Sequence, residues 1–335
     1  MPRIAINGFG RIGRNVLKAG FLKKGFEVVA VNDLTDPATL AHLLRHDTNY
    51  GAYDQKVEAT KDSLIVGGKK IRVYAEKEPT KLPWKAEKID IVLECTGRFT
   101  SEEGASQHIT AGAKGVIISA PAKGGVVPTY VLGVNHSKLG KQYKVINNAS
   151  CTTNCIAPVA AIMHEHFGVK RALMTTIHSY TADQNLQDGP HKDLRRARAA
   201  AANMVPTSTG AAIAVSEAIP ELKDLFDGLS IRVPTSVVSL ADFTFLLRKH
   251  TTEKEINDLF KSMSKTSRWN GILEVTEEPL VSSDFIKNPA SSIVDLGLTK
   301  VVGGDFVKVV AWYDNEWGYS CRLADMALEF AKKLK

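Results

Sequence analysis

The chain has no long hydrophobic segment and few cysteines. No apolar run in its 335 residues approaches the ~20 residues that a membrane-spanning helix needs, and the first residues lack the apolar core of a secretory signal. Its four cysteines are too few for a disulfide scaffold, and none forms the C-x-x-C pair of a zinc ribbon. We therefore expect a cytoplasmic protein with no membrane segment and no metal site.

Internal repeats and low-complexity segments are also lacking. The hydrophobic fraction of 44% and the charged fraction of 24% are those of a globular protein, and the length suits two domains. The 43 Lys and Arg residues exceed the 36 Asp and Glu residues, giving a net charge of +7, and the densest basic cluster spans residues 191–198. This excess fits a binder of small anions, a solvated basic surface, or a secondary nucleic-acid-binding role. Absence of RNA binding at ~150 mM salt would exclude the last of these.

The first 150 residues alternate strands and helices. Residues 3–7 are expected to form a buried strand, residues 12–26 have helical spacing, and residues 27–33 form a β-branched strand. Such a unit favours a parallel sheet with a right-handed crossover. Further strands are expected at residues 90–95, 115–119 and 144–147. The sequence therefore predicts an α/β fold whose residues 1–150 form a Rossmann-type doubly wound parallel sheet domain.

Beyond residue 151 the strands are longer and the helices fewer. A helix is expected over 155–167, with Pro158 in its opening turns or kinking it. Strands are expected at 172–178, 229–237, 242–248 and 307–313. This pattern predicts an α+β catalytic domain over residues 151–315 with a mostly antiparallel sheet. The helical spacing of residues 320–334 predicts that the C-terminal segment 316–335 packs back on the first domain.

A complete G-x-G-x-x-G lies between the first strand and the first helix. Its glycines are Gly8, Gly10 and Gly13, and Arg11 and Ile12 lie inside it. The first glycine permits a tight turn, the second lets the backbone approach a pyrophosphate, and the third lets helix and strand pack closely. The helix N-terminus then offers N–H groups and a positive dipole to the phosphates. The motif predicts a dinucleotide site.

Asp33 ends the next strand, 20 residues after Gly13. A carboxylate at this position accepts hydrogen bonds from the adenosine ribose and repels a 2′-phosphate, which favours NAD over NADP. The alternative is a loop or capping role, which is common for Asp at strand ends. Further candidate cofactor contacts, each also explicable as ordinary turn chemistry, are Lys77, Thr96, Ser119 and Asn315.

Cys151 lies among small polar residues at a strand-to-helix junction. A helix N-terminus and a nearby imidazole lower the pKa of a thiol, and the thiolate is the nucleophile, so Cys151 is the candidate nucleophile. Cys155 is expected to be a buried hydrophobe. His178 ends a strand and is the candidate partner of Cys151. The pair His164 and His166 lacks metal-ligand spacing.

The chain resembles the glyceraldehyde-3-phosphate dehydrogenase family over residues 4–319. The shared motifs are INGFGRIGR (6–14), ASCTTNC (149–155), HSYT (178–181), STGAA (208–212), RVP (232–234) and WYDNE (312–316). The resemblance implies that Cys151 attacks the aldehyde carbon of D-glyceraldehyde 3-phosphate to give a thiohemiacetal, and that His178 accepts the hydroxyl proton as a hydride leaves for NAD. Inorganic phosphate would then release 1,3-bisphosphoglycerate from the thioester.

The resemblance also implies two anion sites and a homotetramer. Thr181 and Arg232 would hold the substrate phosphate. The attacking phosphate would contact Ser150, Thr152, Arg196, Thr209 and Gly210, with Arg195 and Arg198 as open alternatives to Arg196. Asn315 would hydrogen-bond the nicotinamide carboxamide. The segment 180–206 would line the cofactor pocket of a neighbouring subunit.

Three positions depart from the family's usual pattern. Gly189 before a proline weakens the NAD-only inference, Lys77 stands where many bacterial members have arginine, and Cys95 adds an oxidisable thiol. Residual use of NADP stays open. Erythrose-4-phosphate dehydrogenase, the alternative activity, shares the cysteine motif but departs at the stretches that match residues 178–181 and 208–210, which this chain keeps. Aspartate-semialdehyde dehydrogenase lacks the cysteine heptapeptide.

Overall fold

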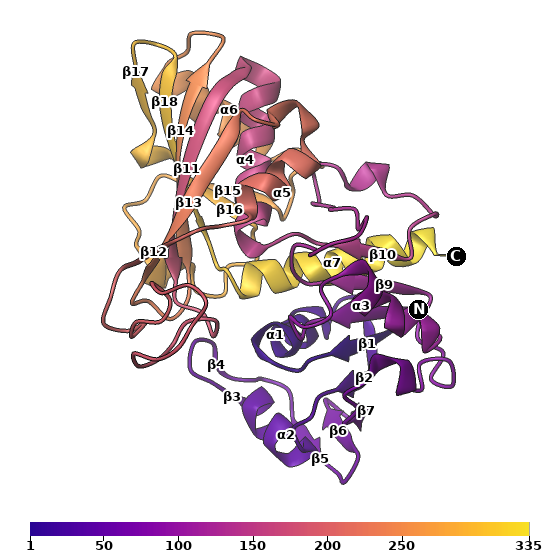
Figure 1. The fold of residues 1–335 in the computed structure, drawn as a ribbon. Helices are drawn as coiled ribbons and strands as arrows, with labels where there is room; N and C mark the ends of the chain where they lie inside the picture. Colours follow the sequence, from indigo (N-terminus) through magenta and orange to yellow (C-terminus); the bar gives the residue numbers. More distant parts are fainter. Residues whose placement is uncertain (335) are drawn as a thin grey trace. The chain divides into compact units, whose positions relative to one another are not determined.

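A computed structural model of the chain describes residues 1–334 and divides into two compact units (Figure 1). Unit 1 comprises Met1–Tyr130, Ser137–Ala149 and the C-terminal segment from Ser320, and unit 2 comprises Val131–His136 and Ser150–Tyr319. Within residues 1–334 no helix has both the length and the apolar content needed to cross a bilayer. The same residues contain no cluster of three or more His, Cys, Asp or Glu side chains that could hold a metal ion.

Unit 1 is built on an eight-stranded sheet with the order β10-β9-β8-β1-β2-β7-β6-β5. Its strands are β1 (Arg3–Asn7), β2 (Glu27–Asn32), β5 (Val57–Ala59), β6 (Ser63–Val66), β7 (Lys69–Tyr74), β8 (Ile91–Glu94), β9 (Gly115–Ile118) and β10 (Val145–Asn147). The six strands from β10 to β7 are parallel, and β6 and β5 continue the sheet in antiparallel fashion. The carboxyl ends of the parallel strands therefore meet at one edge, where ligands bind in such sheets.

Helices cover both faces of this sheet. Neighbouring residues of a strand point to opposite faces, so one buried strand contacts helices on both sides. Ala5 of β1 packs in a cluster with Ala105 of α3 (Glu102–Thr110). The next residue, Ile6, faces Gly13 of α1 (Arg11–Gly20), where a Cβ on the glycine would lie 3.2 Å from the isoleucine side chain. The other helices of the unit are α2 (Pro37–Arg45) and the part of α7 (Trp317–Lys333) that begins at Ser320, and β3 (His46–Asp47) pairs with β4 (Gly51–Ala52).

The first helix is shorter than the sequence predicts. The helical spacing suggested residues 12–26, but α1 ends at Gly20. A side chain at Gly20 would clash with the Phe26 ring, and Gly25 has a φ of 90°, so the chain turns here and brings Phe26 back against the helix. The strands between residues 46 and 74 were not predicted at all.

Unit 2 contains a second sheet with the order β12-β13-β11-β14-β18-β16-β15, and β17 pairs with β18. Its strands are β11 (Val169–Ser179), β12 (Val205–Thr207), β13 (Phe226–Val233), β14 (Ser239–Leu247), β15 (Leu273–Thr276), β16 (Ser292–Asp295), β17 (Lys300–Val302) and β18 (Phe306–Tyr313). Only β11 with β13 and β15 with β16 are parallel pairs. The predicted fold class, a doubly wound parallel sheet plus a mostly antiparallel α+β unit, is confirmed.

The helices of unit 2 gather on one side of this sheet (Figure 1). They are α4 (Cys151–Phe167), α5 (Ala211–Ala218) and α6 (Glu253–Met263). Residues 172, 174, 176 and 178 of β11 are buried, whereas Leu173 on the opposite face is 65% exposed. The period-two pattern places His178 on the helix-covered face, the same face as α4.

Candidate active site

The glycine motif of unit 1 forms a cradle in which two of the three glycines, Gly8 and Gly13, have no room for a side chain. Gly8 has a φ of 88°, and a Cβ there would lie 2.7 Å from the Thr96 backbone nitrogen. A Cβ on Gly13 would lie 2.2 Å from the Gly8 carbonyl oxygen, whereas one on Gly10 would have no neighbour within 4 Å. Gly10 is also the N-cap of α1 and leaves its backbone open. This geometry fits a pyrophosphate at the start of the helix.

A cavity of about 320 Å³ adjoins this cradle. Five of the predicted cofactor contacts line it: Gly8, Gly10, Asp33, Lys77 and Thr96. Asp33 Oδ2 accepts a 2.8 Å hydrogen bond from the Phe9 backbone N–H, and its Oδ1 accepts one from the Thr35 N–H. The Asp33 carboxylate is therefore held against the glycine turn with acceptor capacity left on both oxygens, since each oxygen has two lone pairs.

Other predicted cofactor residues do not line this cavity. Arg11 makes a 2.7 Å ion pair with the buried Asp47, and this pair holds the pKa of Asp47 below its usual value against the effect of burial. Ser119 donates its backbone N–H to the Glu94 carbonyl. Asn315 belongs to unit 2, where its Oδ1 accepts a hydrogen bond from the Ser239 hydroxyl.

In unit 2, Cys151 and His178 come together at the start of α4 and the end of β11. The Sγ of Cys151 lies 3.5 Å from His178 Nε2. His178 Nδ1 lies 2.7 Å from the Ser179 carbonyl oxygen, so Nδ1 carries the proton and donates it to that carbonyl. The unprotonated Nε2 therefore faces the thiol and is placed to accept its proton.

Arg232 of β13 lies against the other side of the imidazole. Its Nη1 is 3.4 Å from His178 Nδ1 and donates a 2.6 Å hydrogen bond to Thr181 Oγ1. Burial and the Arg232 charge together lower the pKa of His178 to about 3, so the ring is neutral at physiological pH. A neutral imidazole is the form that can act as a base.

The thiol of Cys151 is not activated in the way the sequence suggested. A helix N-terminus and a neighbouring imidazole predicted a lowered pKa, but burial dominates and raises the pKa of Cys151. The Arg232 charge and a hydrogen bond to Thr152 act in the opposite direction. Deprotonation of the thiol therefore calls for a proton acceptor, and His178 Nε2 lies 3.5 Å from the sulfur.

Three of the predicted anion-binding residues, Thr181, Arg196 and Arg232, form one connected group within unit 2. Asp183 links its two halves, because it accepts hydrogen bonds from the Thr181 hydroxyl and from Arg196 Nη1. Arg196 also donates to Thr207 Oγ1 at 3.0 Å and to the Ser208 carbonyl, next to Thr209. The Nε of Arg232 is buried and has no hydrogen-bond partner within residues 1–334. An unpaired buried guanidinium N–H beside a threonine hydroxyl fits an anionic oxygen.

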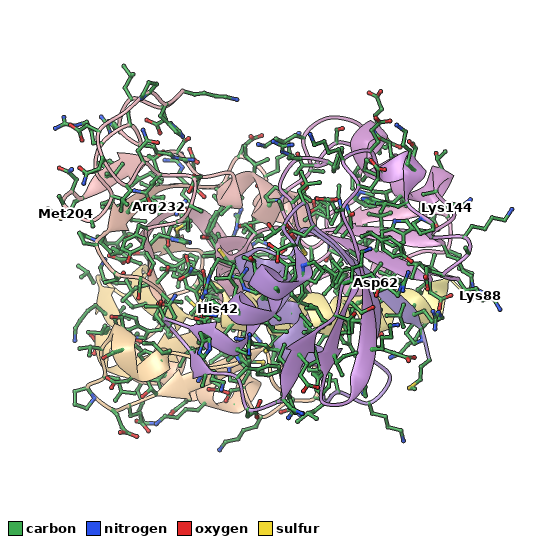
Figure 2. The ribbon with its side chains drawn as sticks, turned by 90° about the horizontal axis from the view of Figure 1, so that it is seen from below. His42, Asp62, Lys88, Lys144, Met204 and Arg232 are labelled. Carbon is green, nitrogen blue, oxygen red and sulfur yellow. The ribbon has the colours of Figure 1, made fainter. Side chains whose placement is uncertain are left out.

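Two residues of unit 2 that are labelled in Figure 2 differ in how far they lie from the surface. Met204 lies at the outer margin and is 75% exposed, whereas Arg232 lies farther inside. The basic segment 191–198 is partly neutralised locally, because Arg196 pairs with Asp183 and Arg198 pairs with Asp188. The cluster of basic residues that the sequence singled out is therefore partly used in ion pairs of its own loop.

Other predicted residues shape the start of α4. Ser150 is its N-cap, and its Oγ accepts the Thr153 backbone N–H at 3.0 Å. Thr152 Oγ1 lies 4.0 Å from the Cys151 sulfur and 3.0 Å from the Tyr313 hydroxyl. Cys155 is fully buried, as expected, and its thiol donates to Ser292.

Sequence reasoning missed Tyr313, Asp183, Asn7 and Asn32. The two asparagines line the cavity of unit 1 at the carboxyl ends of β1 and β2. A polar residue ending a buried strand is a signal that could have identified them. Tyr313 and Asp183 carry no such signal, because their partners are fixed only by tertiary packing.

Comparison with known proteins agrees with this arrangement. Residues 2–102 match the family model described as glyceraldehyde 3-phosphate dehydrogenase, NAD binding domain, and residues 150–315 match the model of the C-terminal domain of the same family. Glyceraldehyde-3-phosphate dehydrogenase 2 of Synechocystis sp. is 51% identical over 338 residues, covering 100% of both chains. The enzymes named glyceraldehyde-3-phosphate dehydrogenase of Zymomonas mobilis and Geobacillus stearothermophilus are each 52% identical, with coverage of 98% or more of each chain. This chain belongs to the glyceraldehyde-3-phosphate dehydrogenase family.

Proposed function

We propose that the protein catalyses the NAD-dependent, phosphorylating oxidation of D-glyceraldehyde 3-phosphate to 1,3-bisphosphoglycerate, a glycolytic reaction. The observation that carries this proposal is the Cys151–His178 pair with Arg232 and Thr181 beside it. A nucleophilic thiol, a neutral base and an anion-binding guanidinium within one cluster suit a phosphorylated aldehyde. Erythrose 4-phosphate is the alternative substrate of the same chemical class.

The first step is proton transfer and addition. His178 Nε2 takes the thiol proton of Cys151 as the sulfur forms a bond to the aldehyde carbon, and the proton then passes to the new alkoxide. This gives a thiohemiacetal on Cys151. The Ser179 carbonyl keeps the ring in the correct tautomer, because it accepts from Nδ1.

The second step converts the thiohemiacetal into a thioester. NAD, when bound, accepts the hydride that leaves the carbon. His178 accepts the hydroxyl proton at Nε2, so the C=O bond forms without a free alkoxide. An oxygen of inorganic phosphate then attacks the thioester carbonyl, the C–S bond breaks, and Cys151 leaves as a thiolate.

Two sets of residues would bind the two phosphates. Thr181 and Arg232 would hold the substrate phosphate, which the unpaired Arg232 Nε supports. Ser150, Thr152, Arg196, Thr209 and Gly210 would hold the attacking phosphate. Asp183 accepts hydrogen bonds from both Arg196 and Thr181. It therefore fixes one side chain of each proposed phosphate site relative to the other before either anion binds.

The test is the appearance of NADH at 340 nm with D-glyceraldehyde 3-phosphate and NAD, with and without inorganic phosphate. We expect sustained turnover only with phosphate, because the thioester needs it as acceptor. Turnover that is indifferent to phosphate would mean hydrolysis and would contradict the second anion site. Faster turnover of erythrose 4-phosphate would favour the alternative.

Unit 1 would be the NAD-binding domain and unit 2 the catalytic domain. The glycine cradle supports residues 8–13 as pyrophosphate contacts. Asp33 and Lys77 would contact the adenosine half, Thr96 and Ser119 would complete the pocket, and Asn315 would bind the nicotinamide carboxamide.

Replacing Asp33 with alanine should weaken NAD binding about tenfold and bring NADP affinity closer to that of NAD, because a ribose acceptor and a charge that repels the 2′-phosphate are both lost. Dissociation constants for both cofactors, measured by calorimetry, give the ratio. The variant Asp33→Asn keeps an acceptor for the Phe9 N–H and controls for disruption of the glycine turn. An unchanged NAD-to-NADP ratio in both variants would contradict the ribose role.

A homotetramer in the cytoplasm is the assembly and location we propose. The sheet face of unit 2 opposite the helices exposes Leu173 (65%) and Leu229 (45%), and the loop 180–206 exposes Leu186 and Leu194. Exposed apolar side chains of this kind indicate subunit contacts. Sedimentation equilibrium should give four times the chain mass of 36.5 kDa, and a monomer would contradict the proposal.

A further inference from the structure

A second histidine of unit 1, outside the proposed chemistry, is completely buried in a polar network. His108 of α3 is 0% exposed, and Glu94 at the end of β8 is 1% exposed. The Trp84 indole Nε1 lies 3.0 Å from His108 Nδ1, and the Glu94 carboxylate lies 3.2 Å from His108 Nε2. A buried imidazole between an indole and a carboxylate has a defined protonation state.

The Trp84 contact sets the tautomer. An indole N–H can only donate, so His108 Nδ1 must accept and is unprotonated. The ring proton therefore sits on Nε2 and points to Glu94. A proton on Nδ1 would face the Trp84 N–H donor, so the geometry selects the Nε2–H tautomer. The side chains around the ring are Glu94, Trp84, Asn7 and Phe99, of which only Glu94 is titratable.

The Glu94 carboxylate accepts four hydrogen bonds. Its Oε2 accepts from His108 Nε2 and from Asn7 Nδ2 at 2.6 Å. Its Oε1 accepts from the Thr96 backbone N–H at 2.8 Å and from the Thr96 hydroxyl. An ionised carboxylate has about four acceptor sites, and here all four are used. Removing any one donor would leave a buried acceptor unsatisfied, which is costly.

Three of these four donors belong to two residues that line the dinucleotide cavity. Asn7 and Thr96 are cavity residues, while His108 and Trp84 lie behind them. Asn7 Oδ1 in turn accepts a hydrogen bond from Asn32 Nδ2 at 2.7 Å. The Asn32 amide also donates to the Glu76 backbone carbonyl and accepts from the Glu76 backbone N–H, next to Lys77. The network therefore connects the buried Trp84 to three residues that line the cavity, Asn7, Asn32 and Thr96.

We propose that His108 is a positioning residue for the dinucleotide: fixed as the Nε2–H tautomer by Trp84, it donates to Glu94, and Glu94 holds Asn7 and Thr96 in the conformation that the cofactor needs. His108 touches neither cofactor nor substrate. Its effect is on NAD affinity and not on the chemical step. This inference rests on unit 1 binding NAD.

Two near-isosteric variants separate this role from simple packing. The amide nitrogen of glutamine can replace His108 Nε2 as donor to Glu94, whereas asparagine reaches only the position of Nδ1 and can satisfy Trp84 alone. We expect His108→Gln to keep the dissociation constant for NAD within about threefold of the wild-type value. His108→Asn should raise it about tenfold, the effect of one lost hydrogen bond to a charged acceptor. The kcat at saturating NAD and the KM for the aldehyde should stay within about twofold in both.

The matched control is Leu64→Ala, in a buried position of β6 in the same unit but outside the network. It should lower the melting temperature without changing NAD affinity. Equal NAD affinity in the asparagine and glutamine variants, or losses that track the melting temperature through all three variants, would overturn the proposal. Failure of the wild-type protein to bind NAD would instead count against the proposed function.

A spectroscopic measurement on the wild-type protein tests the tautomer without any variant. In protein labelled with ¹⁵N-histidine, His108 should show a protonated Nε2 and an unprotonated Nδ1, because Nδ1 accepts from the Trp84 indole. The signal is assigned by its loss in His108→Gln. A protonated Nδ1 would contradict the proposal.

Discussion

Replacement of Cys151 by serine should abolish activity, lowering kcat/KM for D-glyceraldehyde 3-phosphate by about 10⁴-fold. A serine hydroxyl is a far weaker acid than a thiol. Transfer of the serine proton to His178 is therefore far less favourable than transfer of the thiol proton to the same imidazole. The ester that serine would form is also a poorer acyl donor than a thioester. The NADH assay with inorganic phosphate measures the loss.

The same substitution should leave the fold and the NAD site intact. Cys151 is the first residue of α4, directly after the N-cap Ser150, and serine differs from cysteine only in the side-chain oxygen that replaces sulfur. The matched control is Cys155→Ser, the same chemical change one turn later in the same helix. Cys155 is fully buried, so this variant should be destabilised by about 1–3 kcal/mol yet keep activity within about fivefold. Activity of Cys151→Ser within tenfold of the parent would remove Cys151 as nucleophile.

The sequence predicts the two-sheet architecture well because its signals are local. β-branched runs that end in glycine or polar residues identify β1, β2, β8, β9 and β10, each to within one or two residues. The strands between residues 46 and 74 escape prediction because several are only two or three residues long, as in β3 and β4. Their pairing depends on neighbours and not on hydrophobic periodicity.

The residues of the candidate site also fall into two groups, those that a local sequence pattern identifies and those that only tertiary packing brings together. Glycines and a carboxylate at fixed spacing predict the cavity around Gly8 and Asp33, since backbone geometry dictates residue type there. The Trp84–His108–Glu94 network is invisible in the sequence, because its members are separated by up to 24 residues and Asn7 lies 101 residues from His108. Burial likewise raises the pKa of Cys151, an effect that the local motif does not report.

Removal of the Arg232 charge should produce the second large effect. In Arg232→Leu we expect kcat/KM for D-glyceraldehyde 3-phosphate to fall about 10³-fold, because a buried fork of N–H donors to phosphate is lost. Arg232 offers an unpaired buried Nε and an Nη1 already set against Thr181. The phosphate of the substrate would therefore lose its main cation, and Thr181 would lose the group that orients its hydroxyl.

Substrate truncation shows whether phosphate is the group that Arg232 binds. D-Glyceraldehyde lacks the phosphate, so its kcat/KM should change by less than about fivefold in Arg232→Leu, while the phosphorylated substrate loses most of its advantage. Because Arg232 also lowers the pKa of both His178 and Cys151, an equal fall for the two substrates would instead assign it to the chemical step. The exposed Arg248, just after β14, supplies the control: Arg248→Leu removes the same charge from unit 2 and should leave both substrates unaffected. A loss confined to the phosphorylated substrate and to Arg232→Leu would place the substrate phosphate between Arg232 and Thr181.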